Sequence, residues 1–108
     1  MIFQLGSALL DACVLAVLAQ EDCYGYRLTS KIKEVMEISE STLYPVLRRL
    51  QKDGMLTTYD KAYQGRNRRY YSLTEAGKER SRIYREEWQT FKRQIDGIME
   101  GENSDDKG

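Results

Sequence analysis

The feature that most constrains the fold is a change in the hydrophobic period at Gly54. Before it, apolar residues recur at spacings of three and four, which indicates amphipathic helices. After it, residues 55–73 are rich in Thr, Tyr and Leu with a period of two, which indicates two strands joined by a turn. From Thr74 onward the helical period returns. This order of elements predicts an α+β fold that is mostly α-helical.

Three helices are expected before the change of period. The first, at about residues 6–19, is apolar nearly all round, and a helix without a polar face is buried on several sides. In a chain of 108 residues this suggests that a second subunit covers part of it. The second helix is expected at about residues 24–36, with Val35 or Met36 as its last apolar contact.

The third helix lies in the stretch SESTLYPVLRRLQKDG at residues 39–54. Ser39 or Ser41 is expected to cap its N-terminus and Gly54 to end it. Pro45 lacks an amide proton, which a helix tolerates near its start and not further in. The apolar stripe consists of Leu43, Val46, Leu47 and Leu50. The opposite face consists of Ser41, Pro45, Arg48 and Lys52, flanked by Tyr44 on one side and by Thr42 and Arg49 on the other.

The hairpin is expected to have strands at about residues 55–63 and 69–73, with residues 64–68 as the connection. Its tyrosines are most simply cross-strand partners. Thr74 is expected to cap a last helix that runs to about residue 99. The polar tail, residues 101–108, is expected to be disordered.

A basic block lies in the middle of a chain whose formal net charge is zero. Residues 41–73 hold seven bases and two acids, whereas residues 94–108 hold one base and five acids. A local cluster of basic residues attracts a phosphate backbone whatever the total charge of the chain. The charge distribution therefore favours binding to nucleic acid, although the total charge does not. The bases of the block are Arg48, Arg49, Lys52, Lys61, Arg66, Arg68 and Arg69.

Two short helices joined by a tight turn and followed by a basic hairpin match a winged helix-turn-helix. The outer face of the third helix fits a DNA major groove, where Arg48 would reach a guanine or a phosphate, and Arg49 and Lys52 would reach phosphates. The hairpin would lie along the backbone or in the adjacent minor groove. The expected DNA-contacting residues are Ser41, Thr42, Tyr44, Pro45, Arg48, Arg49, Lys52, Arg66, Asn67 and Arg68.

Several residues near this surface have two interpretations. Tyr44 either contacts DNA or closes the turn against the second helix. Tyr24 and Tyr26 either donate their hydroxyls to phosphates or pack at the start of the second helix. Arg69 is either a further basic contact or the partner of Asp60 on the neighbouring strand.

The last helix carries apolar residues at steps of 4, 3, 4 and 3, the spacing of a helix that pairs with another helix. These residues are Tyr84, Trp88, Phe91, Ile95 and Ile98. They predict a homodimer, and thus a two-fold symmetric operator with half-sites about 10 bp apart. Trp88 either packs in the interface or, with Tyr84, Phe91 and Ile95, forms a site for an aromatic ligand. Glu87 nearby would favour a cationic ligand.

Other classes of function have little support. The chain has no histidine, no zinc-ligand spacing and no phosphate-binding glycine loop, so neither an enzyme nor a metal or other cofactor is expected. Cys13 is expected in the core and Cys23 partly exposed, without a disulfide, which favours the cytoplasm. The apolar run at residues 8–19 is too short to cross a membrane. A winged-helix module that binds another protein remains the alternative, although it would need no basic hairpin.

Three stretches carry a resemblance to a known family. YGYRL, STLYPVLRRLQKDG and RRYYSLTEAG resemble the start of the second helix, the recognition helix and the wing-to-helix junction of the PadR family of bacterial transcription regulators. The resemblance covers about residues 9–99. It implies a winged helix-turn-helix at residues 1–73 and a C-terminal dimerisation helix at residues 74–100, usually in a repressor.

The single short C-terminal helix resembles that of the small-PadR subgroup. Some members of this subgroup bind flat aromatic drugs between paired tryptophans at the dimer interface. Trp88 falls at the matching place, counted from LTEAG. The resemblance therefore implies a planar aromatic or phenolic effector that would release the protein from DNA.

Overall fold

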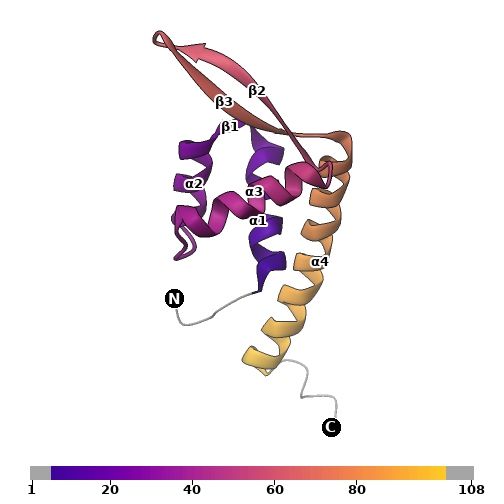
Figure 1. The fold of residues 1–108 in the computed structure, drawn as a ribbon. Helices are drawn as coiled ribbons and strands as arrows, with labels where there is room; N and C mark the ends of the chain where they lie inside the picture. The colour runs from indigo at the N-terminus through magenta and orange to yellow at the C-terminus, as the bar shows by residue number, and fades with distance from the viewer. Residues whose placement is uncertain (1–5, 102–108) are drawn as a thin grey trace.

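Residues 6–101 form four helices and a small antiparallel sheet (Figure 1). It is described by a computed structural model that covers residues 6–101, so the predicted polar tail, apart from Gly101, lies outside the described residues. The expected α+β, mostly helical fold is confirmed. The elements are α1 Ser7–Gln20, β1 Cys23–Tyr24, α2 Gly25–Lys33, α3 Glu40–Lys52, β2 Leu56–Tyr63, β3 Arg66–Leu73 and α4 Glu75–Glu100.

The hydrophobic core is built around α1, which lies between the other helices in Figure 1. Val14, Leu15 and Leu18 are 0–3% exposed. The helix contacts α2, α3, α4 and β3, which is why nearly its whole circumference is apolar. A strip containing Ala12 and Ala16 lies outside the core, and Ala16 is exposed. This uncovered strip forms one wall of a groove considered below.

The α2–α3 pair settles two alternatives that the sequence left open. Ser39 is the N-cap of α3, and its hydroxyl accepts a hydrogen bond from the Thr42 amide at 3.3 Å. Pro45 is therefore further inside the helix than a cap at Ser41 would place it. The second helix ends at Lys33, shorter than expected, and Met36 packs against the core while Val35 is 65% exposed.

The hairpin is longer and its turn tighter than the sequence indicated. Residues 66–68 belong to β3, so the expected five-residue connection is wrong, and Gln64 and Gly65 alone join the strands. Both residues have positive φ, 52° and 78°. A two-residue turn of this kind matches the twist of the flanking strands, which favours it over a longer connection.

A third strand was missed by the sequence analysis. Cys23 and Tyr24 form β1, which pairs antiparallel with Tyr71 and Tyr70 of β3, so the sheet order is β1-β3-β2. Cys23 is 0% exposed, and the expectation of a partly exposed thiol is wrong. Two residues are too short for a period of two to be recognised in sequence.

The long helix α4 starts against the hairpin and then runs along α1 (Figure 1). The Thr74 hydroxyl accepts from the Gly77 amide at 3.0 Å and donates to the Gly54 carbonyl at 2.6 Å. A side chain at Gly77 would come well inside 3.0 Å of the Met55 carbonyl oxygen. Glycine is therefore required where α4 crosses the end of α3 and the start of β2.

Candidate nucleic-acid interface

The outer face of α3 is exposed as the helical period predicts. Leu43, Leu47 and Leu50 are 0–4% exposed and attach the helix to the core. On the other side Arg48 and Lys52 make no ion pair with the described residues. Their cationic groups are thus available to an anion. The remaining exposed residues of this face are Ser41, Thr42, Tyr44 and Pro45.

Arg49 differs from its neighbour Arg48 because it is bound within the protein. Its Nη2 donates to Asp11 Oδ1 of α1 at 2.7 Å, and the Asp11 side chain is only 11% exposed. The hydrogen bond to this carboxylate and its negative charge raise the pKa of Arg49. The pairing of Asp11 with a residue 38 positions away was not predicted from the sequence. Through this ion pair Arg49 connects α3 to α1, which is a structural role.

Tyr44 lies where α3 meets the start of α2. An added Cβ at Gly25 would lie 3.3 Å from the Tyr44 hydroxyl and 3.9 Å from the ring of Tyr71. Burial, more than the nearby Tyr44 hydroxyl, raises the pKa of Tyr71. Tyr44 is still 36% exposed, so it closes the α2–α3 contact and also reaches the surface.

The hairpin projects from the body of the molecule beyond its contact with α3 (Figure 1). Arg66 and Asn67 are exposed next to the turn, and Arg66 makes no ion pair with the described residues. Arg68 is half-buried between the rings of Tyr24 and Tyr63. Arg69 Nε lies 3.6 Å from Asp60 Oδ1, the pairing that the sequence analysis held as one alternative.

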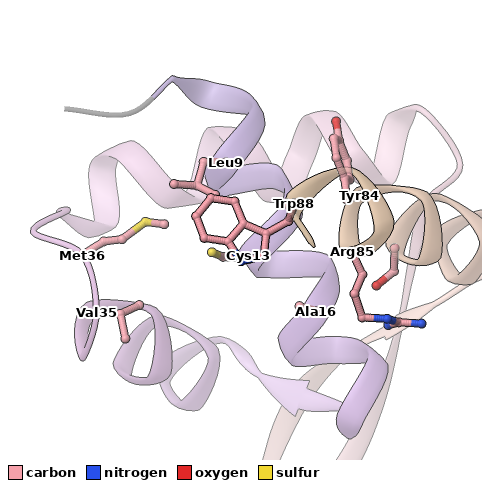
Figure 2. A pocket seen from close by; sticks show the side chains of 10 residues that line it. Leu9, Cys13, Ala16, Val35, Met36, Tyr84, Arg85 and Trp88 are labelled. Carbon is pink, nitrogen blue, oxygen red and sulfur yellow. The ribbon is translucent and has the colours of Figure 1, made fainter. Parts of the chain in front are cut away.

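A second feature is an apolar groove of about 330 Å³ between α1, α4 and the α2–α3 turn. Figure 2 shows Trp88 of α4 facing Leu9 and Cys13 of α1, with Met36 on the far wall. Tyr84 and Trp88, two of the four residues that the sequence analysis named for a ligand site, line this groove. Its full lining is Leu9, Ala12, Cys13, Ala16, Val35, Met36, Ser81, Tyr84, Arg85 and Trp88.

Phe91 and Ile95 do not line this groove. The Phe91 ring lies 6.2 Å from that of Trp88 and is 51% exposed, on the side of α4 that no described element covers. Ile98 and Met99 further along α4 are 73% and 68% exposed. An apolar strip of this kind on one helix indicates a surface for another protein chain.

Sequence analysis missed one polar residue of the groove. Ser81 is 4% exposed, and its hydroxyl has no hydrogen-bond partner among the described residues. A buried hydroxyl without a partner is energetically unfavourable. In the sequence it stands between Arg80 and Arg82 and follows no recognised motif. The one signal that could have found it is its place three residues before Tyr84, at the spacing of the apolar stripe.

Within residues 6–101, no group of His, Cys, Asp and Glu side chains is arranged to hold a metal ion. None of the helices in this part of the chain is long and apolar enough to span a membrane.

Comparison with known proteins places this geometry among transcription factors. The chain is 42% identical to smu.1704 from Streptococcus mutans UA159, whose crystal structure superposes with a TM-score of 0.87 over 94% of this chain and 95% of that one. It is 26% identical to Bacillus subtilis PadR, solved in complex with operator DNA, with a TM-score of 0.63 over 70% of this chain and 45% of that one.

Sequence similarity agrees with these structural matches. The transcriptional regulator Rv3488 of Mycobacterium tuberculosis (strain ATCC 25618 / H37Rv) is 38% identical over 61 residues, which are 56% of this chain and 57% of that protein. Residues 14–83, from the middle of α1 to α4, match the model of the transcriptional regulator PadR-like family. The chain therefore belongs to the PadR-like family of transcriptional regulators.

Proposed function

We propose that the chain is a homodimeric, sequence-specific DNA-binding regulator that represses transcription. The observation that carries this proposal is the presence of two basic residues, Arg48 and Lys52, on the exposed face of α3 beside a projecting basic hairpin. Neither makes an ion pair with any residue that the structure describes. The similarity to Bacillus subtilis PadR, solved with operator DNA, supports it. A repressor of this kind would occupy its operator and exclude RNA polymerase.

The proposed roles follow from exposure and charge. The small Ser41 and Thr42 and the flat Pro45 allow α3 to approach the floor of the major groove, where Arg48 reads a guanine or binds a phosphate. Lys52, Arg66 and Asn67 contact the backbone and set the register without specifying sequence. Tyr44 contacts DNA through its exposed edge, and Arg68 also belongs to the DNA-binding surface. Arg49 is not included among the DNA-contacting residues, because it is bound to Asp11.

Two copies are proposed to associate through α4. Phe91, Ile98 and Met99 expose apolar surface that no element within residues 6–101 covers, and Ile95 lies between them at helical spacing. Burial of this strip in a second copy would place two α3 helices on a two-fold symmetric operator. The groove beside Trp88 would then lie next to the subunit interface.

A planar aromatic or phenolic ligand in this groove is proposed to release the protein from DNA. The volume suits a small aromatic molecule. An apolar lining with a buried hydroxyl at Ser81, which has no hydrogen-bond partner in the described part of the chain, is typical of a ligand site. A ligand that wedges α4 from α1 would change the separation of the two α3 helices. Operator binding requires a fixed separation, so the ligand would weaken it.

The DNA-binding proposal is tested by fluorescence anisotropy with DNA from upstream of the gene that encodes the protein. Affinity should fall steeply with salt, because each phosphate contact releases counterions. Arg48→Ala should cost about 1–3 kcal/mol and relax base preference if Arg48 reads guanine, whereas Arg66→Ala should weaken all sequences equally. Absence of binding at low salt, or binding indifferent to salt, would refute the proposal.

The dimer proposal is tested by sedimentation. Phe91→Glu should shift the protein toward monomer without unfolding it, because the ring is exposed within one chain. Gln89→Glu lies on the opposite side of α4 by helical spacing and serves as the control. A wild-type monomer at micromolar concentration would contradict the proposal.

The ligand proposal is tested by titrating tryptophan fluorescence with planar cationic dyes and with phenolic acids. Trp88 is the single tryptophan, so quenching reports on the groove. Ser81→Ala should weaken binding of any ligand that bonds the hydroxyl and leave the shape of the groove intact. If neither the dyes nor the phenolic acids change the fluorescence, the ligand proposal is refuted and Trp88 serves in packing alone.

A further inference from the structure

The outer face of the sheet carries a row of aromatic and basic side chains. In the strand register Tyr63 is paired with Arg66, Lys61 with Arg68, and Tyr70 with both Tyr59 and Tyr24. Paired residues and residues two apart lie on the same face of a sheet. The opposite face carries the core residues Cys23, Leu56 and Leu73. The row therefore faces away from the core.

Arg68 lies at the centre of this row. Its guanidinium carbon is 4.0 Å from the centroid of the Tyr24 ring and 3.9 Å from that of the Tyr63 ring. The two rings come from β1 and β2, the strands on either side of β3. Arg68 is half-buried, whereas residues 61–67 around it are all exposed. The two tyrosines thus form a clamp on the guanidinium.

The clamp is connected to the body of the protein by further ring contacts. The rings of Tyr24 and Tyr70 meet edge to face at 5.7 Å, and those of Tyr70 and Tyr59 stack at 5.5 Å with planes 10° apart. The Tyr59 hydroxyl donates to Asp22 Oδ2 at 2.7 Å, in the segment between α1 and β1. A continuous series of contacts therefore runs from this segment to Tyr63, the residue next to the turn.

A projecting hairpin needs such contacts. Two strands without a core of their own are marginally stable, and the hairpin beyond its contact with α3 buries no apolar residue. Tyrosine rings attract the faces of a guanidinium and leave its N–H donors, which lie in the plane, free for another partner. A clamped guanidinium offers those donors at a fixed position, which lowers the entropic cost of binding.

We propose that Tyr24 and Tyr63 are positioning residues for DNA binding, which hold the Arg68 guanidinium so that its N–H edge meets the DNA backbone. This inference rests on the proposed DNA-binding function. Arg66 is the natural contrast, because it lies near Arg68 on the same face and makes no ring contact or ion pair with the described residues. Arg66 contributes charge, whereas Arg68 contributes charge in a fixed orientation.

The first test compares two conservative replacements. Arg68→Lys keeps the charge and removes the planar group that the rings hold, so operator affinity should fall roughly three- to tenfold. Arg66→Lys should lower affinity by a clearly smaller factor than Arg68→Lys, because no ring holds the Arg66 guanidinium and its charge is kept. Equal effects of the two replacements would overturn the proposal.

The second test removes the clamp without changing any charge. Tyr63→Leu should weaken operator binding by a similar factor while the slope of affinity against salt stays the same, because no phosphate contact is lost. Tyr63→Phe keeps the ring and should bind as the wild type does. A loss in Tyr63→Phe as large as in Tyr63→Leu would mean that the hydroxyl contacts DNA directly, and would overturn the proposal.

A third measurement needs no DNA. Proton NMR of the free protein should show the Arg68 side-chain protons shifted upfield by the two rings, in the wild type and Tyr63→Phe but much less in Tyr63→Leu. Random-coil shifts in the wild type would refute the clamp even if the protein binds DNA. Conversely, failure of the wild type to bind any operator would refute the proposed function while these shifts still report on the clamp.

Discussion

The Asp11–Arg49 pair allows a structural role to be separated from a DNA-binding role at adjacent positions. Asp11 lies among buried leucines and valines, with its side chain 11% exposed, and Arg49 Nη2 at 2.7 Å neutralises it. Arg49→Ala leaves this carboxylate without its counterion in an apolar environment. Arg48→Ala, one position away, removes an arginine that makes no ion pair with the described residues.

The cost of Arg49→Ala can be bounded from the two exposures. Breaking a fully buried ion pair costs about 3–5 kcal/mol, and a surface pair is worth about 0–1 kcal/mol. The guanidinium is 46% exposed and the carboxylate is nearly buried, so we expect about 2 kcal/mol. In a domain of this size that lowers Tm by roughly 10 °C. Arg48→Ala should stay within about 0.5 kcal/mol of the wild type.

Urea denaturation followed by circular dichroism, at one fixed protein concentration, measures these differences. The double variant Asp11→Leu with Arg49→Met should recover most of the loss, because it replaces the pair with apolar groups and leaves no buried charge. DNA binding of folded Arg49→Ala should be weakened less than that of Arg48→Ala. If Arg49→Ala unfolds at the same urea concentration as the wild type, the assignment of a structural role is refuted.

Three further predictions concern packing and thiol chemistry. Gly77→Ala should destabilise the protein by about 2–3 kcal/mol in urea denaturation, because the new methyl group collides with the Met55 carbonyl. Gly65→Ala should cost about 1–2 kcal/mol at its φ of 78°, measured as faster amide hydrogen exchange within the hairpin while α1 stays protected. Burial raises the pKa of Cys23 and of Cys13, so at pH 8 both thiols should react with iodoacetamide more slowly than a free cysteine does. Cys23 is fully buried and should react more slowly than Cys13. Mass spectrometry measures both rates of labelling.

Gly6→Ala is the control for both glycine replacements. Gly6 precedes α1 with a φ of −70°, and nothing lies within 4 Å of an added Cβ. It should change stability by less than about 1 kcal/mol. A Gly77→Ala protein as stable as this control would show that α4 can move away from Met55 at little cost. Labelling of Cys23 as fast as a free thiol would contradict its burial.

The local pattern of the sequence determined the order of the elements and the faces of α3. Leu43, Leu47 and Leu50 recur with the helical period, so their burial and the exposure of Arg48 follow from spacing alone. The Thr74 cap and the hairpin are equally local, because each depends on neighbouring residues. The length of the turn was predicted wrongly, since the glycine signal is compatible with two residues or five.

Tertiary structure alone decided which charged and aromatic residues have partners. Arg48 and Arg49 are adjacent arginines that were both expected to contact DNA, and they differ because α1 places a buried carboxylate beside Arg49. The strand β1, the clamp on Arg68 and the burial of the Ser81 hydroxyl likewise depend on segments far apart in the chain. The physical reason is that periodicity specifies the direction of a side chain from its own element, whereas its neighbours depend on how several elements pack together.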